Sequence, residues 1–404
     1  MMKIFSKIPG CIKAIGIVSF LLNASTLIVY SIFGLYLHEK LGVDLKKIGF
    51  LDGAVEAFSF IIKIGSGIIS DCIMNRKFLL LLGGIFLFIA KPLEATAKTY
   101  WLLFQAKILE RFGNGLQSTP RDAIVGDWAP KNSKGTCFGF RQTLAALGSV
   151  VGAILAFVLL DYSNGDFQFV FWMASIPSGF ALLVIILFVR EKKQCNKTQV
   201  KNCNIKKFRR ITIKDIKNLG PQYWMLIGIA STYMISKVTE SLVILYVIKK
   251  LGLPVNYGPI CMICYQIANS FISLPAGIIS DKLKRRENVF IFGIIIFLLS
   301  DILFIFGNTM IAMIFALFFL GSYIGISQSI FPAKIIDLVP SDLKGTGIGI
   351  FNFVCATSFL IGGSMSGYIA DKYNMQMSFI VSSLLAIFSL SVLLISKKFK
   401  FNKQ

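Results

Sequence analysis

The chain has 404 residues, of which 55% are hydrophobic and only 15% are charged. A soluble globular domain carries about 25% charged residues, so this composition excludes an ordinary soluble protein and favours membrane helices. The net charge of +22 would suggest nucleic-acid binding in a soluble protein. Here the basic residues lie mainly between apolar runs, so we expect no nucleic-acid partner.

Twelve apolar runs are long enough, at about 20 residues each, to cross a bilayer. They lie near 11–37, 46–70, 78–97, 99–126, 136–160, 167–189, 222–247, 257–280, 288–307, 310–337, 346–369 and 374–396. The runs at 46–70 and 99–126 contain several charges, but an internal repeat supports them. The first run has no small-residue cleavage site after it, so we expect a membrane helix there rather than a cleaved signal.

A strongly basic segment at 190–221 separates the first six runs from the last six. It holds eleven Lys and Arg residues and two acids. We expect a cytoplasmic linker that touches lipid headgroups, between an N-terminal six-helix bundle at 1–189 and a C-terminal one at 222–404. With the N-terminus inside, 27 of the 42 Lys and Arg residues fall in cytoplasmic segments and 7 in outer ones. This bias predicts that both termini are cytoplasmic.

Similar segments recur at a constant offset of 210 positions. GIISD at 67–71 recurs at 277–281, and DWAPKNSKGT at 127–136 aligns with DLVPSDLKGT at 337–346. A single offset of 210 positions that relates several separate segments indicates an internal duplication. Because each copy holds an even number of helices, both copies have the same orientation in the membrane. The sequence thus predicts an all-α membrane protein of two six-helix bundles, related by a parallel pseudo-two-fold repeat, with a solute path between them.

The repeated GIISD segments resemble the loop motif of the major facilitator superfamily, G-x-x-x-D followed by basic residues. The first copy, GIISDCIMNRK, has Cys72 and Met74 where the family has a basic residue and a glycine, and GIISDKLKRRE is closer. The resemblance implies twelve helices that rock between two states, with a cytoplasmic latch that stabilises the outward-facing state. The latch residues are Gly67, Asp71, Arg76, Gly277, Asp281, Arg285 and Arg286.

The segment ERFGNGLQSTPRDAIVGD at 110–127 is similar to the family's arginine-and-glycine motif in its fourth helix. A proline inside a helix frees a backbone carbonyl and favours a kink, so we expect a structural or gating role here. The motif residues are Gly113, Gly115, Pro120, Arg121, Asp122 and Asp127. The family's antiport motif ends in Gly-Pro, but GSVVGA at 148–153 ends in Ala153, so both symport and antiport stay open.

Charged residues inside membrane spans are costly and are candidates for function. The second predicted helix places Asp52, Glu56 and Lys63 on one face, because their spacings are four and seven residues. Two carboxylates one turn apart repel each other, so one of them could carry a proton. The alternative is that Glu56 forms a structural ion pair. The full set of substrate or coupling candidates is Asp52, Glu56, Lys63, Arg111, Arg141, Lys237 and Glu240.

Arg111 is the strongest of these candidates, since a guanidinium can hold a carboxylate or phosphate through two hydrogen bonds. The competing interpretation is a salt bridge between Arg111 and an acid such as Glu56. We expect Arg141 to pair with Asp122 or Asp127. Lys237 and Glu240 are three residues apart and are expected to pair with each other.

The sequence contains no P-loop, and its one histidine cannot build a metal cluster, so we expect neither an enzyme nor a cofactor. We predict a monomeric secondary transporter in a bacterial inner membrane, with a small polar or anionic metabolite, protons and membrane lipids as partners. Two alternatives are proton-driven efflux of amphipathic compounds and a non-transporting receptor or scaffold on the same fold.

Overall fold

The computed structural model describes residues 9–73, 75–130, 134–190, 219–282, 286–339 and 344–401. Within these ranges the chain forms helices joined by short turns, and no strand. Nine helices in the same ranges are long and apolar enough to cross a membrane. The other three predicted spans, near 46–70, 99–126 and 257–280, are also helical. The structure is therefore consistent with twelve spans.

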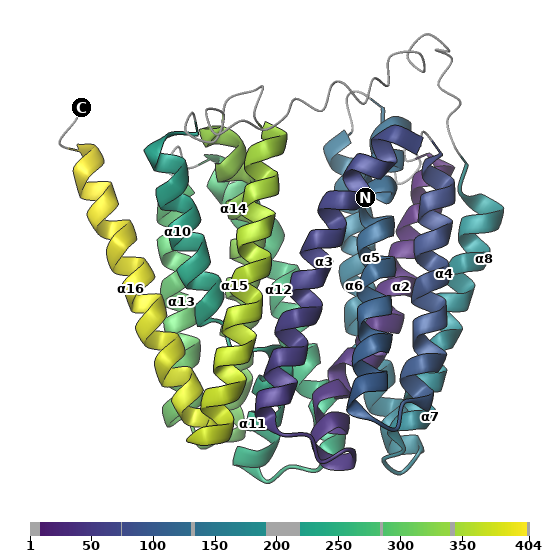
Figure 1. The fold of residues 1–404 in the computed structure, drawn as a ribbon, viewed down its shortest axis with the longest axis horizontal. Helices are drawn as coiled ribbons and strands as arrows, with labels where there is room; N and C mark the ends of the chain where they lie inside the picture. Colours follow the sequence, from purple (N-terminus) through teal and green to yellow (C-terminus); the bar gives the residue numbers. More distant parts are fainter. Residues whose placement is uncertain are drawn as a thin grey trace.

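The first part of the chain forms long helices that run alternately up and down (Figure 1). They are α2 (Gly10–Leu35), continued by the π-helical turn η1 (Tyr36–Lys40), α3 (Leu45–Ile73), α4 (Arg76–Thr96), α5 (Tyr100–Trp128), α6 (Lys134–Tyr162), α7 (Phe167–Met173) and α8 (Ser175–Phe188). Side-chain caps begin two of them. Asn75 accepts a hydrogen bond from the Phe78 N–H at the start of α4, and Thr99 accepts one from the Leu102 N–H at α5. Such caps satisfy N–H groups that a helix start leaves unpaired.

The second part of the chain forms the helices on the other side of Figure 1. They are α10 (Gly220–Ser236), α11 (Glu240–Leu251), the short η5 (Val255–Tyr257), α12 (Gly258–Lys282), α13 (Arg286–Phe306), α14 (Met310–Leu338), α15 (Lys344–Lys372) and α16 (Met375–Phe401). We call α2–α8 the first group and α10–α16 the second group. Helices α3 and α15 pack against each other between the groups. Most of the predicted linker, 191–218, lies outside the described residues.

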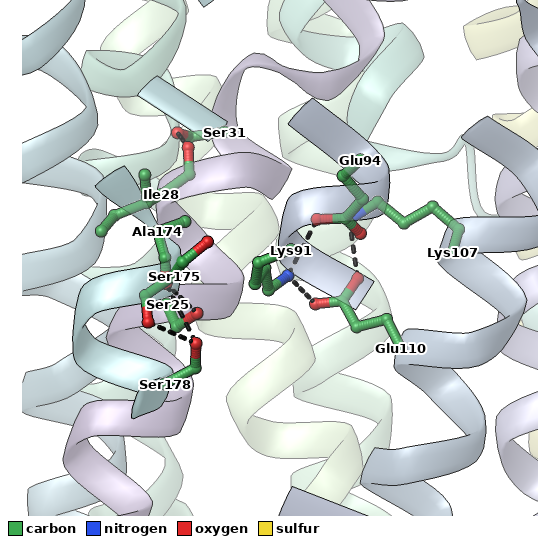
Figure 2. Close-up of polar contacts among 10 residues, drawn as sticks. All are labelled: Ser25, Ile28, Ser31, Lys91, Glu94, Lys107, Glu110, Ala174, Ser175 and Ser178. Atoms are coloured by element: carbon green, nitrogen blue, oxygen red, sulfur yellow. Dashed lines mark hydrogen bonds and ion pairs between the residues drawn. The ribbon is translucent and has the colours of Figure 1, made fainter. Parts of the chain in front are cut away.

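Two of the predicted spans each consist of two helical segments in the structure. Helices α7 and α8 meet at Ala174, whose carbonyl accepts hydrogen bonds from the hydroxyls of Ser25, at 2.6 Å, and Ser178, at 3.3 Å (Figure 2). The span near 222–247 is broken at 237–239, between α10 and α11. A helix break leaves backbone carbonyls and N–H groups without helical partners. Both predicted spans are long and apolar enough to cross a membrane despite the breaks, and no Gly or Pro marks the break at 237–239.

A glycine seam, made by Gly49 and Gly53 of α3 with Gly363 and Gly367 of α15, lets these two helices pack backbone to backbone. A Cβ on Gly363 would lie only 2.5 Å from the Gly49 carbonyl oxygen, and one on Gly53 would lie 2.6 Å from the Phe359 carbonyl oxygen. Only a residue without a side chain permits this approach. The seam lies toward the end of the molecule where α3 begins and α15 ends. This seam end is opposite the end where α2 begins and α16 ends (Figure 1).

We expect Gly363→Val to separate the two groups at the seam end, because the added side chain would overlap the Gly49 backbone. Disulfide crosslinking between cysteines at Lys46 and Tyr368 reports this contact, since Lys46 Nζ lies 5.4 Å from the Tyr368 ring centroid. Crosslinking should fall severalfold in the valine variant. Gly349→Val is the matched control, because a Cβ at Gly349 meets no atom within 4 Å. Equal crosslinking in both variants would contradict the prediction.

Candidate functional site

Glu240 is the first residue of α11, directly after the helix break, and binds one side chain from the break and one from each of two other helices. Its Oε1 accepts hydrogen bonds from Lys237 Nζ at 2.6 Å and from the Tyr265 hydroxyl of α12 at 3.0 Å. Its Oε2 accepts one from the Tyr30 hydroxyl of α2 at 2.9 Å. The predicted pairing of Lys237 with Glu240 is confirmed. The sequence did not predict the contacts of Tyr30 and Tyr265 with Glu240. Tyr30 and Glu240 are nevertheless separated by 210 positions, which is the offset of the repeat.

Arg111 of α5 and Glu56 of α3 face each other near Tyr30. Arg111 Nη2 lies 3.9 Å from Glu56 Oε1, and the Arg111 guanidinium carbon lies 5.8 Å from the Tyr30 ring centroid. The ion pair is too long for a hydrogen bond. The Glu56 side chain is 36% exposed and the Arg111 side chain 13%. The structure therefore brings the predicted partners together in a loose, partly accessible pair.

Asp52 and Lys63 extend this site along α3 in opposite directions. Asp52 is 7% exposed and lies beside the hydroxyls of Thr239 and Ser241. Lys63 Nζ lies 5.1 Å from the Phe60 ring centroid, in a cation–π contact. Phe60 in turn stacks on Phe359 of α15, with ring centroids 5.7 Å apart.

We call Asp52, Glu56, Lys63, Arg111, Lys237 and Glu240 the central cluster. Both groups of helices contribute to it, and its three cations balance its three anions.

Arg141 is not part of the central cluster. Its Nε lies 3.4 Å from Asp122 Oδ1, and Arg121 Nε lies 3.6 Å from the same oxygen. Asp127, the other predicted partner, pairs instead with Arg76, so that the end of α5 is joined to the start of α4. These ion pairs lie toward the end of the molecule opposite the glycine seam.

The remaining motif residues of α5 contact neighbouring helices. A Cβ on Gly113 would lie 2.6 Å from the Gly83 carbonyl oxygen of α4, and one on Gly115 would lie 2.5 Å from Ile62 of α3. Pro120 is buried inside α5, which continues as a helix to Trp128. The side-chain positions of the other latch residues, Gly67, Asp71, Gly277, Asp281, Arg285 and Arg286, lie outside the described residues. The latch therefore stays a prediction.

A family model for the Major Facilitator Superfamily matches residues 15–356 and 225–403 of the chain. The chain belongs to the major facilitator superfamily. The predicted family and fold class are thereby confirmed, and the family consists of transporters rather than enzymes.

Relatives of this superfamily member cover almost its full length. An uncharacterised MFS-type transporter of Methanocaldococcus jannaschii is 28% identical over 389 residues, which cover 93% of this chain and 92% of the relative. A bacterial homologue of the human lysosomal transporter Spinster, in an inward-facing and occupied conformation, has a similar fold, with a TM-score of 0.75, 13% identity and 96% of each chain covered. The nucleoside transporter NupG aligns with a TM-score of 0.73 and 15% identity, over 95% of this chain and 99% of that one.

A buried ionic ring joins α4 to α5 in this superfamily member (Figure 2). Lys91 Nζ lies 3.1 Å from Glu94 and 2.5 Å from Glu110, and Lys107 Nζ lies 3.0 Å from Glu94 and 2.7 Å from Glu110. All four side chains are at most 2% exposed. The ring holds α5 in one rotation, in which the next residue, Arg111, faces Glu56. The ionic ring was not predicted from the sequence, although α4 and α5 each carry a Lys and a Glu three residues apart.

Several contacts besides the glycine seam join the two groups at the seam end. His38 of η1 contacts Lys249 of α11, and the Asn256 amide donates to Asp161 at 3.3 Å. Their positions at the ends of α2, α11 and α6 place them on the same side of the central cluster as the seam. The structure thus holds the two groups together at that end.

Proposed function

We propose that this superfamily member is a secondary active transporter that moves a small polar or anionic metabolite. The loose pair of Arg111 and Glu56 carries this proposal. A solute carboxylate or phosphate could form two short hydrogen bonds to the guanidinium, in place of one contact of 3.9 Å to Glu56. Exchange of a weak internal partner for a strong external one favours binding and keeps the Arg111 guanidinium paired.

We further propose that transport proceeds by rocking of the first group against the second, with the boundaries predicted at 1–189 and 222–404. The contacts at the seam end support a state closed at that end. The excess of basic residues in the segments on the termini side supports a cytoplasmic location for both termini. If the seam end faces the outside of the cell, a closed seam end corresponds to an inward-facing conformation. Rocking would then break the seam and open the central cluster to the other side.

Glu56 is the proposed proton carrier of this transporter. When a solute occupies Arg111, Glu56 loses its cationic partner, and protonation would remove the resulting unpaired negative charge. Binding of an anionic solute would therefore favour uptake of a proton on the same side of the membrane. This exchange couples the solute gradient to the proton gradient.

We expect Glu56→Gln to abolish the pH dependence of transport, because glutamine has the shape of a protonated glutamate and cannot release a proton. Initial rates in proteoliposomes, measured over a range of pH, would test this. Asp371→Asn, at an exposed position near the end of α15, is the control and should keep the wild-type pH profile. A wild-type profile in Glu56→Gln would show that Glu56 is a structural partner of Arg111.

An uptake screen tests the proposed function directly. Purified protein in proteoliposomes would be offered pools of radiolabelled metabolites, with and without an imposed proton gradient. We expect one class of small polar or anionic solute to accumulate against its gradient, and a protonophore to abolish the accumulation. Failure to move any solute, including by counterflow, would favour the receptor or scaffold alternative.

Efflux of amphipathic compounds is the second candidate function. The aromatic rings of Tyr30, Phe60 and Phe359 each lie near a cationic side chain of the central cluster. Such ring faces could also hold the apolar part of an amphipathic cation. Proton-driven movement of a lipophilic cationic dye in the same proteoliposomes, with no movement of polar metabolites, would favour efflux.

A further inference from the structure

Three buried oxygen atoms meet at the break between α10 and α11. They are Asp52 Oδ2, Thr239 Oγ1 and Ser241 Oγ, and none forms a hydrogen bond of normal geometry with any part of the chain that the structure describes. The two hydroxyls lie beside the Asp52 carboxylate. A buried polar atom without a partner costs about 1–3 kcal/mol. A cluster of three such atoms therefore indicates a bound water or ion.

Packing holds each of these groups in place. Asp52 lies on α3, one turn before Glu56, and forms no ion pair within the described ranges. Thr239 is the N-cap residue of α11, but its hydroxyl makes no capping hydrogen bond, although threonine at this position commonly does. Ser241 is pressed against α2, because a Cβ on Gly34 would lie 2.7 Å from the Ser241 Cβ. Both hydroxyls are thus available to a ligand shared with Asp52.

The helix break adds further oxygen donors. Helix α10 ends at Ser236, and Lys237 has an extended backbone with φ −69° and ψ 120°. The carbonyls of the last turn of α10 therefore lack backbone partners, although that of Tyr233 accepts a hydrogen bond from the Ser236 hydroxyl at 2.7 Å. A helix C-terminus also carries partial negative charge. Carboxylate, hydroxyl and carbonyl oxygens are the donors that hard cations prefer. Broken helices supply such carbonyls to Na⁺ in other transporters.

The surrounding charges leave Asp52 uncompensated. Glu240 and Arg111 are the charged groups that act on Asp52 from the facing helices. Lys237 is bound to Glu240 at 2.6 Å, and Arg111 lies closest to Glu56, its only ion-pair partner among the described residues. Lys63, the third cation of the central cluster, lies eleven positions further along α3, which is about three helical turns away. The Asp52 carboxylate therefore has no cation of its own nearby among the described residues, and a single monovalent cation would neutralise it.

We propose that Asp52, Thr239 and Ser241 form a binding site for a monovalent cation, with Na⁺ as the occupant. The carboxylate belongs to the first group and the hydroxyls to the second. A bound cation would therefore draw the two groups together near the seam end. Its link to transport rests on the proposed function, whereas binding of Na⁺ does not.

Thermal unfolding of the purified, detergent-solubilised protein tests the site with Na⁺ itself as the probe. We expect NaCl to raise the Tm saturably relative to choline chloride and KCl at equal ionic strength and pH. Asp52→Asn should abolish this response. Ser241→Ala keeps the carboxylate and should weaken the apparent Na⁺ affinity by about tenfold.

Asp301→Asn and Ser382→Ala are matched controls. Asp301 is also buried, at 1% exposure, and accepts hydrogen bonds from Ser382 at 2.7 Å and Ser383 at 3.1 Å. Because these groups already satisfy one another, both control variants should keep the wild-type response to Na⁺.

The proposal is overturned if wild-type protein shows no Na⁺-specific rise in Tm, or if Asp52→Asn retains the full rise. A stability change that follows pH but not Na⁺, and disappears in Asp52→Asn, would identify the ligand as a proton and also reject the cation site. No solute or transport is needed for this measurement. A Na⁺ response in protein that moves no solute would leave the cation site standing and reject only the proposed transport.

Discussion

Glu110→Leu is expected to lower the free energy of unfolding by about 3–5 kcal/mol, because it leaves two buried lysines with one carboxylate. Glu110 binds Lys91 at 2.5 Å and Lys107 at 2.7 Å, so its loss removes half of the contacts in the ionic ring. The surrounding helices exclude water that could otherwise solvate the freed ammonium group. Denaturant titration of the purified protein, followed by intrinsic fluorescence, would measure the loss.

The charge-balanced double variant Lys107→Met with Glu110→Leu separates ionic from packing effects. It leaves Lys91 bound to Glu94 at 3.1 Å and introduces no unpaired charge. Replacement of a buried ion pair by apolar residues of similar volume is often neutral or stabilising. We therefore expect the double variant to recover most of the stability. If it were as unstable as Glu110→Leu, the loss would come from packing rather than from unpaired charge.

Arg111→Ala is expected to abolish solute transport while the protein still folds and inserts. Among the ion pairs that the structure describes in the central cluster, the pair of Arg111 and Glu56 is the long one, at 3.9 Å. Arg111 is therefore the cation whose internal partner a solute would replace most easily. Truncation of one member of a hydrogen-bonded charge pair costs about 2 kcal/mol or more, which corresponds to a loss of about 30-fold or more in binding. Uptake in proteoliposomes would measure the effect, and size-exclusion chromatography would confirm the fold.

Two further variants define what Arg111 contributes. Arg111→Lys keeps the positive charge but cannot form the two parallel hydrogen bonds of a guanidinium, so we expect most of the activity to be lost. Lys98→Ala removes a cation from an exposed turn between α4 and α5 and should transport normally. Wild-type turnover in Arg111→Ala would reject the role of Arg111 in solute binding.

Much of the fold could be predicted from the sequence because the responsible forces act locally. A run of about 20 apolar residues crosses the bilayer whatever its neighbours are, and the repeat of GIISD reveals the duplication without any contact information. The pair of Lys237 and Glu240 was predictable because residues three positions apart cannot lie far from each other, although the structure places Lys237 in the break and only Glu240 on a helix. The weaker spans at 46–70 and 99–126 were recognised only through the repeat.

Contacts between helices depend on rotation, tilt and breaks, which the packing of the whole bundle decides. No Gly or Pro marks the break at 237–239, and Thr239 before Glu240 is only a weak helix-start signal. Yet the break places Thr239 and Ser241 beside Asp52. Close approach of α4 to α5 at Gly83 and Gly113 brings two short-range Lys–Glu pairs into one ring.

The sequence by itself determined the membrane class, the repeated helices and the residues able to carry charge, because composition and periodicity express these directly. Only the tertiary structure decided which charges meet, because glycine contacts and a helix break set the distances between side chains far apart in the chain.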